Sequence, residues 1–139
     1  MKTPARALVG FLILNALMPI AFTVIGLVSP AALLSGFGIA ATTESVAAGA
    51  LFPSFTLVVA AWTLVAIAWL LRGKREGLTM AMWLGALCVA AGVMNGLAFA
   101  TLGRNPLVDA PDFVRGLCIL ALCAWASRTA KLATPALAS

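Results

Sequence analysis

The chain has 139 residues, of which 63% are hydrophobic and only 9% are charged, and its formal net charge is +5. Soluble domains are about 45–50% apolar and about 25% charged, so this composition excludes an ordinary soluble enzyme and predicts a membrane protein. The length allows a single domain, because four membrane spans of about 20 residues use most of the chain.

Four long apolar stretches, separated by more polar loops, predict helices that cross a bilayer. They lie at about residues 7–28, 46–71, 78–102 and 113–126. We therefore expect an all-α integral membrane protein that forms an antiparallel four-helix bundle, with residues 1–139 as one transmembrane domain.

The basic residues fall mainly on alternate sides of these spans. Seven of the nine lie before the first span, between the second and third, or after the fourth: Lys2, Arg6, Arg72, Lys74, Arg75, Arg128 and Lys131. Short basic loops stay in the cytoplasm, so we expect a multi-pass protein of the bacterial inner (cytoplasmic) membrane with both termini cytoplasmic. Because the charge is explained by topology, no nucleic-acid partner is expected.

The first span contains Asn15 and Pro19, four residues apart. Proline has no N–H and its ring clashes with the carbonyl four residues earlier, so a polar kink is expected near mid-membrane. A neighbouring helix or a hydroxyl can satisfy the freed carbonyl and the Asn15 amide, and Thr23 is one such partner. We favour a packed kink over a polar lining for a ligand.

A short helix over about residues 30–37 should follow the first span. Ser29 at the N-cap, Pro30 at the first helical position and glycines past the end are typical helix punctuation. Too short to cross, this helix is expected to lie at the outer interface. Glu44 then sits at the positive end of the next helix dipole, which explains it without a function, although a ligand or proton site is the alternative.

Aromatic and proline residues mark the second span. Pro53 frees the Gly49 carbonyl and should bend the outer third of this helix. Three tryptophans lie toward the cytoplasmic ends of their spans and are expected to form interfacial anchors: Trp69, Trp83 and Trp125.

The third span carries small residues at helical spacing. These candidates for close helix packing are Gly85, Gly92, Gly96 and Ala100. Asn95 lies among them, where a buried amide needs a partner. Asn15 and Asn95 are expected to be the deepest polar side chains of the protein.

The loop before the fourth span is the most polar part of the chain. Asp112 and Arg115, three residues apart, are expected to pair on one helix face, and Arg104 could pair with Asp109. We favour a self-neutralised surface loop. The alternative is an outward-facing polar mouth that binds a ligand, built from six residues: Glu44, Asn95, Arg104, Asp109, Asp112 and Arg115.

The sequence lacks the residues that several kinds of chemistry require. The three cysteines form no CxxC pair, and no histidine is present to ligate haem, chlorin or an ordinary zinc site. We therefore predict no metal, no cofactor and no catalytic residues.

The layout resembles small, uncharacterised four-helix bacterial membrane proteins near the DoxX-like group. The residues that carry this resemblance are the run Ser29–Gly38 after the first span, with Pro30, Gly36 and Gly38, and the polar Gly103-Arg104 loop before the last span. The resemblance implies a four-helix protein of the bacterial inner membrane and no established activity.

These observations favour a non-enzymatic role. We expect an accessory or structural subunit that packs through apolar helix faces against other membrane protein subunits, with the lipid bilayer as its surroundings. The alternative is a binder or small transporter of a lipophilic small molecule, with the polar mouth facing outward. An intramembrane isomerase or hydratase is a third hypothesis, for which Glu44 is the candidate carboxylate.

Overall fold

The computed structural model describes residues 3–36, 38–49, 52–101, 103, 107 and 110–131, and these contain no strand. Their helices, in chain order, are α1 (Thr3–Val28), α2 (Pro30–Gly36), α3 (Thr43–Gly49), α4 (Phe52–Leu71), α5 (Arg75–Thr101) and α6 (Ala110–Lys131). Within α1, α4, α5 and α6, the segments Thr3–Val28, Pro53–Leu71, Arg75–Ala98 and Ala110–Thr129 are long and apolar enough to cross a membrane. The prediction of an all-α chain with four long apolar helices is confirmed.

The chain divides into two compact units. Unit 1 comprises Met1–Leu12 and Val65–Ser139, and unit 2 comprises Ile13–Leu64. Both boundaries fall inside long helices, so α1 and α4 each contribute residues to both units.

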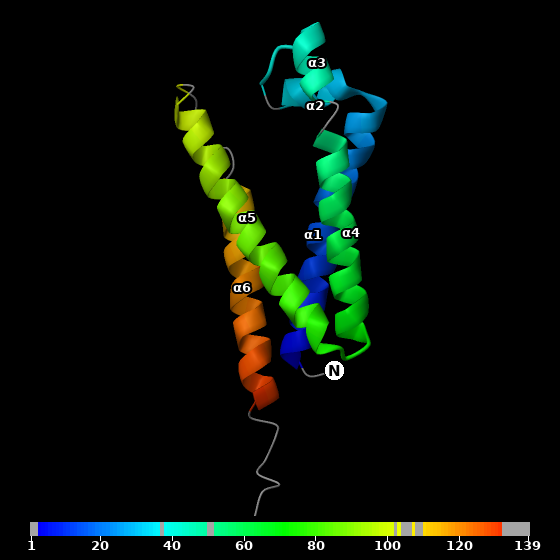
Figure 1. The fold of residues 1–139 in the computed structure, drawn as a ribbon, viewed down its shortest axis with the longest axis vertical. Helices are drawn as coiled ribbons and strands as arrows, with labels where there is room; N and C mark the ends of the chain where they lie inside the picture. The colour runs from blue at the N-terminus through cyan, green and yellow to red at the C-terminus, as the bar shows by residue number, and fades with distance from the viewer. Residues whose placement is uncertain are drawn as a thin grey trace, which may run out of the picture. The chain divides into compact units, whose positions relative to one another are not determined.

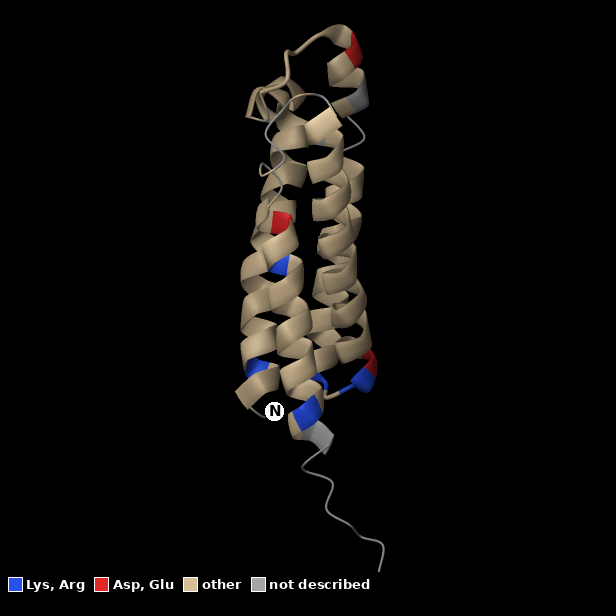
Figure 2. Ribbon diagram, turned by 90° about the vertical axis from the view of Figure 1, so that its left-hand side faces the viewer, with Lys and Arg blue, Asp and Glu red and all other residues tan. Residues whose placement is uncertain are grey.

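Unit 1 is built on the antiparallel pair α5 and α6 (Figure 1). Gly85 lies against Gly116, and Gly92 lies against Phe113, as expected for helices that run in opposite directions. The unit's buried apolar side chains come from all four long helices: Leu8, Val9, Leu12, Ala66, Ile67, Leu70, Ala81, Leu84, Cys88, Ile119 and Cys123. Most of the basic residues of unit 1 lie at the end where α1 begins and α4 meets α5 (Figure 2).

Unit 2 contains a second antiparallel pair, the remaining parts of α1 and α4. Gly26 lies against the ring of Pro53, and Thr23 bonds to Thr56. The short helices α2 and α3 pack on each other, with Leu34 against Gly49. Figure 1 shows α2 turned across the direction of α1.

The ends of α2 follow the punctuation that its sequence predicts. The Ser29 hydroxyl accepts a long hydrogen bond of 3.4 Å from the Ala32 N–H. Gly38 has a positive φ of 69°, and the Ile39 N–H bonds to the Leu34 carbonyl at 2.9 Å. This 6→1 bond closes the helix in a left-handed turn that favours glycine.

Two helices, α3 and α4, are described over the expected second span, and residues 50 and 51 between them lie outside the described residues. The Thr42 and Ser45 side chains cap α3 reciprocally, since each accepts a bond from the other residue's N–H, at 3.2 and 2.8 Å. Helix α3 ends at Gly49 and α4 begins at Phe52. Pro53 cannot donate to the Gly49 carbonyl, which is the physical basis of the bend expected at this position.

Candidate functional site

The contact between α5 and α6 depends on three glycines of unit 1. A Cβ atom at Gly116 would lie 2.6 Å from the Gly85 carbonyl oxygen and 2.7 Å from the Val89 nitrogen. A Cβ atom at Gly92 would lie 2.7 Å from the Phe113 nitrogen. The two backbones therefore approach as closely as glycine allows, which aligns the start of α6 with the middle of α5.

Of the expected packing residues, Gly85 and Gly92 make this contact. Gly96 is half-buried and Ala100 is exposed. Sequence reasoning missed Gly116, because a glycine without a small-xxx-small partner on its own helix gives no local signal.

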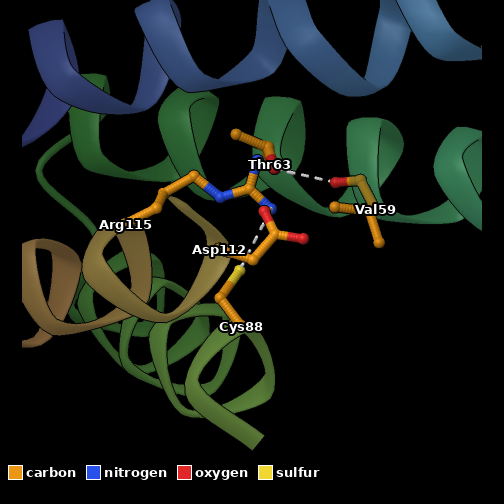
Figure 3. Close-up of polar contacts among 5 residues, drawn as sticks. All are labelled: Val59, Thr63, Cys88, Asp112 and Arg115. Carbon is orange, nitrogen blue, oxygen red and sulfur yellow. Dashed lines mark hydrogen bonds and ion pairs between the residues drawn. The ribbon is translucent and has the colours of Figure 1, made fainter. Parts of the chain in front are cut away.

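An ion pair lies beside this glycine contact. Arg115 Nη2 is 2.8 Å from Asp112 Oδ1, which confirms the pairing expected from their spacing of three residues. The same nitrogen also donates to Cys88 Sγ on α5, at 3.5 Å. In Figure 3 the guanidinium group points toward both partners. The side chains are only 17% exposed for Arg115 and 32% exposed for Asp112.

The depth of this pair differs from the sequence expectation. Cys88 is the central residue of α5, which spans Arg75–Thr101 and has 27 residues. At 1.5 Å per residue, Arg115 therefore lies opposite a point about 20 Å from either end of α5. The reason is the register: α5 continues to Thr101 past Gly92, whereas α6 begins only three residues before the opposing Phe113. Asp112 and Arg115 are thus deeper along α5 than Asn95.

The other residues of the expected polar mouth are distributed as follows. Asn95 is exposed, and helix periodicity puts it on the side of α5 that carries Cys88 and Gly92, one turn beyond the α6 contact. Glu44 is exposed in the first turn of α3 and belongs to unit 2. Arg104 and Asp109 lie outside the described residues. The structure therefore brings Asp112 and Arg115 together within unit 1, with Cys88 as an additional contact.

Unit 2 has a different polar cluster, at the proline positions of α1 and α4. Thr23 Oγ1 lies 2.7 Å from the Pro19 carbonyl oxygen and 2.8 Å from Thr56 Oγ1. Thr56 Oγ1 lies 3.1 Å from the Pro53 carbonyl oxygen. Both threonine side chains are buried.

Two hydroxyl protons serve these three contacts. The two shorter contacts form together when Thr23 donates to the Pro19 carbonyl and Thr56 donates to Thr23. Thr23 thus bonds to the carbonyl of Pro19 itself, while Asn15 is half-buried on the same helix. A third buried threonine, Thr63, donates to the Val59 carbonyl at 2.7 Å within α4 (Figure 3).

The expected tryptophan anchors differ in exposure. Trp69 is half-buried, and Lys74 Nζ lies 5.9 Å from the centre of its ring, within the range of a cation–π contact. Trp83 and Trp125 are exposed. All three belong to unit 1.

Neither a metal-binding group among the described residues nor a related protein indicates a function for this chain. Among the described residues, no three His, Cys, Asp or Glu side chains are grouped so that they could hold a metal ion. The three cysteines, Cys88, Cys118 and Cys123, are free thiols. No protein-family model, curated protein or solved structure matches this chain.

Proposed function

We propose that α1, α4, α5 and α6 cross a bacterial inner membrane as one antiparallel bundle, with both termini cytoplasmic and α2 at the outer interface. The four long apolar helices support the insertion. The basic residues at one end of unit 1 support the orientation. The similarity in layout to the DoxX-like group agrees with this arrangement.

We further propose that the protein binds a lipophilic small molecule at Asp112 and Arg115. The observation that carries this proposal is the ion pair opposite the centre of α5. On insertion scales an arginine or aspartate at a helix centre costs about 2.5–3.5 kcal/mol, which is an upper bound for Asp112 and Arg115 in the first two turns of α6, and pairing offsets part of this cost. Asp112 lies in the first turn of α6, where a carboxylate is favourable, but leucine at both positions would lower the cost of insertion, so we take the charged pair as the candidate binding group.

The chemistry of the pair indicates the kind of ligand. The guanidinium group has five N–H donors, and the Asp112 carboxylate is an acceptor. Their charges cancel, so a head group that is neutral overall and offers both an acceptor and a donor fits better than an ion. The apolar helix surfaces on either side suit a hydrocarbon body. The ligand class is therefore a lipophilic molecule with a hydroxyl, carbonyl or carboxylic acid head.

Native mass spectrometry of the full chain, gently solubilised from membranes, tests this proposal. The wild type should retain a small molecule that the double variant Asp112→Leu, Arg115→Leu loses. The matched control is Thr23→Val, Thr56→Val, which removes the polar pair of unit 2 and should retain the ligand. A wild type without a bound small molecule, or a leucine variant that keeps it, would reject the proposal.

An accessory-subunit role is the second candidate, and the surface of α1 favours it. Large apolar side chains are exposed along this helix, including Leu14, Leu17, Leu27 and Val28, the last two at 71% and 81%. Such a surface suits lipid or the helix of another membrane subunit. The same spectra distinguish these roles, because a stoichiometric copurifying protein would indicate the subunit and a bound small molecule would indicate the binder.

A further inference from the structure

The basic end of unit 1 is a charged surface that the proposed ligand site does not involve. Five basic side chains are exposed there, from α1, the α4–α5 turn, the start of α5 and α6: Arg6, Arg72, Lys74, Arg75 and Arg128. Figure 2 shows basic residues gathered at this end of the unit, and the acidic Glu76 directly follows Arg75 in the chain. A strong positive potential is therefore concentrated on one small surface.

The turn between α4 and α5 holds three of these side chains in a fixed arrangement. Gly73 has a positive φ of 70°, and the Lys74 N–H bonds to the Trp69 carbonyl at 2.9 Å, which closes α4. A Cβ atom at Gly77 would lie 2.6 Å from the Leu70 nitrogen, so the start of α5 packs tightly on the end of α4. Arg72, Lys74 and Arg75 are thus held within four residues on a rigid turn, which reduces the entropy lost on binding.

Tryptophans mark the level at which this surface would meet a bilayer. Trp69 and Trp125 each precede an arginine by three residues, Arg72 just after the end of α4 and Arg128 on α6. Tryptophan prefers the boundary between acyl chains and headgroups, so the arginines one turn further would lie at the level of lipid phosphates. The exposed side chains of Leu71 and Trp83 provide an apolar surface nearby for acyl chains.

We propose that this surface, formed by Arg6, Arg72, Lys74, Arg75 and Arg128, binds the phosphate headgroups of anionic phospholipids. Guanidinium groups hold phosphate through paired N–H bonds, and Lys74 adds a point charge. The tryptophans and the adjacent apolar surface favour a lipid over a soluble phosphate. This inference rests on the proposed membrane insertion, and it is independent of the proposed ligand at Arg115, about 20 Å away along α6.

The test uses the full chain in nanodiscs that contain equal amounts of phosphatidylglycerol and phosphatidylcholine with the same acyl chains. Lipids retained after transfer to detergent are counted by native mass spectrometry. The wild type should retain phosphatidylglycerol preferentially. The triple variant Arg72→Gln, Lys74→Gln, Arg75→Gln should lose on the order of 10- to 100-fold of this preference, since each basic residue near an anionic surface contributes about fivefold.

Two further variants separate the causes. Arg72→Lys, Arg75→Lys keeps the charge and should retain most of the preference, whereas a loss equal to that of the triple variant would overturn the role of charge. Asp112→Leu, Arg115→Leu should keep the full lipid preference even if it loses the small molecule, so the two proposals fail separately. Equal retention of both lipids by the wild type, or an unchanged preference in the triple variant, would reject the anionic-lipid site.

Discussion

In both helix pairs of this protein the two helices approach closely, but different polar groups lie at the two contacts. In unit 1, Gly85 and Gly116 bring α5 and α6 together beside a charged pair. In unit 2, Gly26 approaches the ring of Pro53, and two neutral threonine hydroxyls bond to each other. Both pairs use a glycine for close approach, but only unit 1 contains charges at its contact.

The polar side chains of the two contacts also differ in their position relative to the prolines of their helices. In unit 2, Thr23 donates to the Pro19 carbonyl and accepts from Thr56, which lies one turn after Pro53, so the threonine pair connects the proline turns of α1 and α4. No proline lies within α6 near Arg115, except Pro111 in the first turn, where helices tolerate it. The Asp112–Arg115 pair therefore lies beside no proline in the interior of its own helix.

The largest expected effect is at the glycine contact of unit 1. Gly116→Ala puts a methyl group against backbone atoms of α5, which cannot move independently. We expect a loss of about 1–3 kcal/mol or more in the free energy of unfolding, measured by denaturant titration in mixed micelles. Gly10→Ala is the control, because a Cβ there has nothing within 4 Å and its stability should change little. Equal stability of both variants would show that α6 can move away from α5 without a loss of free energy of unfolding.

The ion pair should show a smaller effect with a distinctive pattern. Asp112→Leu or Arg115→Leu alone leaves one charge without its ion-pair partner and should cost about 1–2 kcal/mol, less than in a fully buried pair because both groups are partly exposed. The double variant should be about as stable as the wild type, since apolar residues replace such pairs without loss. A double-mutant cycle by the same titration measures this. A double variant that is as unstable as the sum of the single variants would make the pair a structural feature.

The sequence was sufficient for the long helices but not for their contacts. Apolar runs marked the four long helices, and the spacing of Asp112 and Arg115 indicated their pairing. Their depth was not predictable, because it depends on how far α6 is displaced along α5. The fourth span expected at about residues 113–126 is shorter than α6, which covers Ala110–Lys131.

Contacts between distant residues explain the other misses. No sequence pattern marked Thr56 as a polar contact. Its hydrogen bond depends on Thr23, which is 33 residues earlier in the chain and lies opposite it in the fold. Gly116 likewise matters only because Gly85 faces it on another helix. Spacing along one helix reports which residues share a face, but the partner of that face is set by tertiary register.

The smallest expected effect on stability is at the threonine pair of unit 2. Thr23→Val and Thr56→Val keep the side-chain shape and remove the hydroxyls, so each should cost about 0.6–2 kcal/mol, the range for interhelical hydrogen bonds in membrane proteins. Because the two residues share one bond, the double variant should cost less than the sum, with a coupling of about 0.6–1.7 kcal/mol in a double-mutant cycle. Here, unlike at Asp112 and Arg115, removing both polar groups should leave a net loss, since two buried hydrogen bonds are lost and no cost of burying charge is relieved. A double threonine variant as stable as the wild type would contradict the expected difference between the neutral threonine pair and the charged pair.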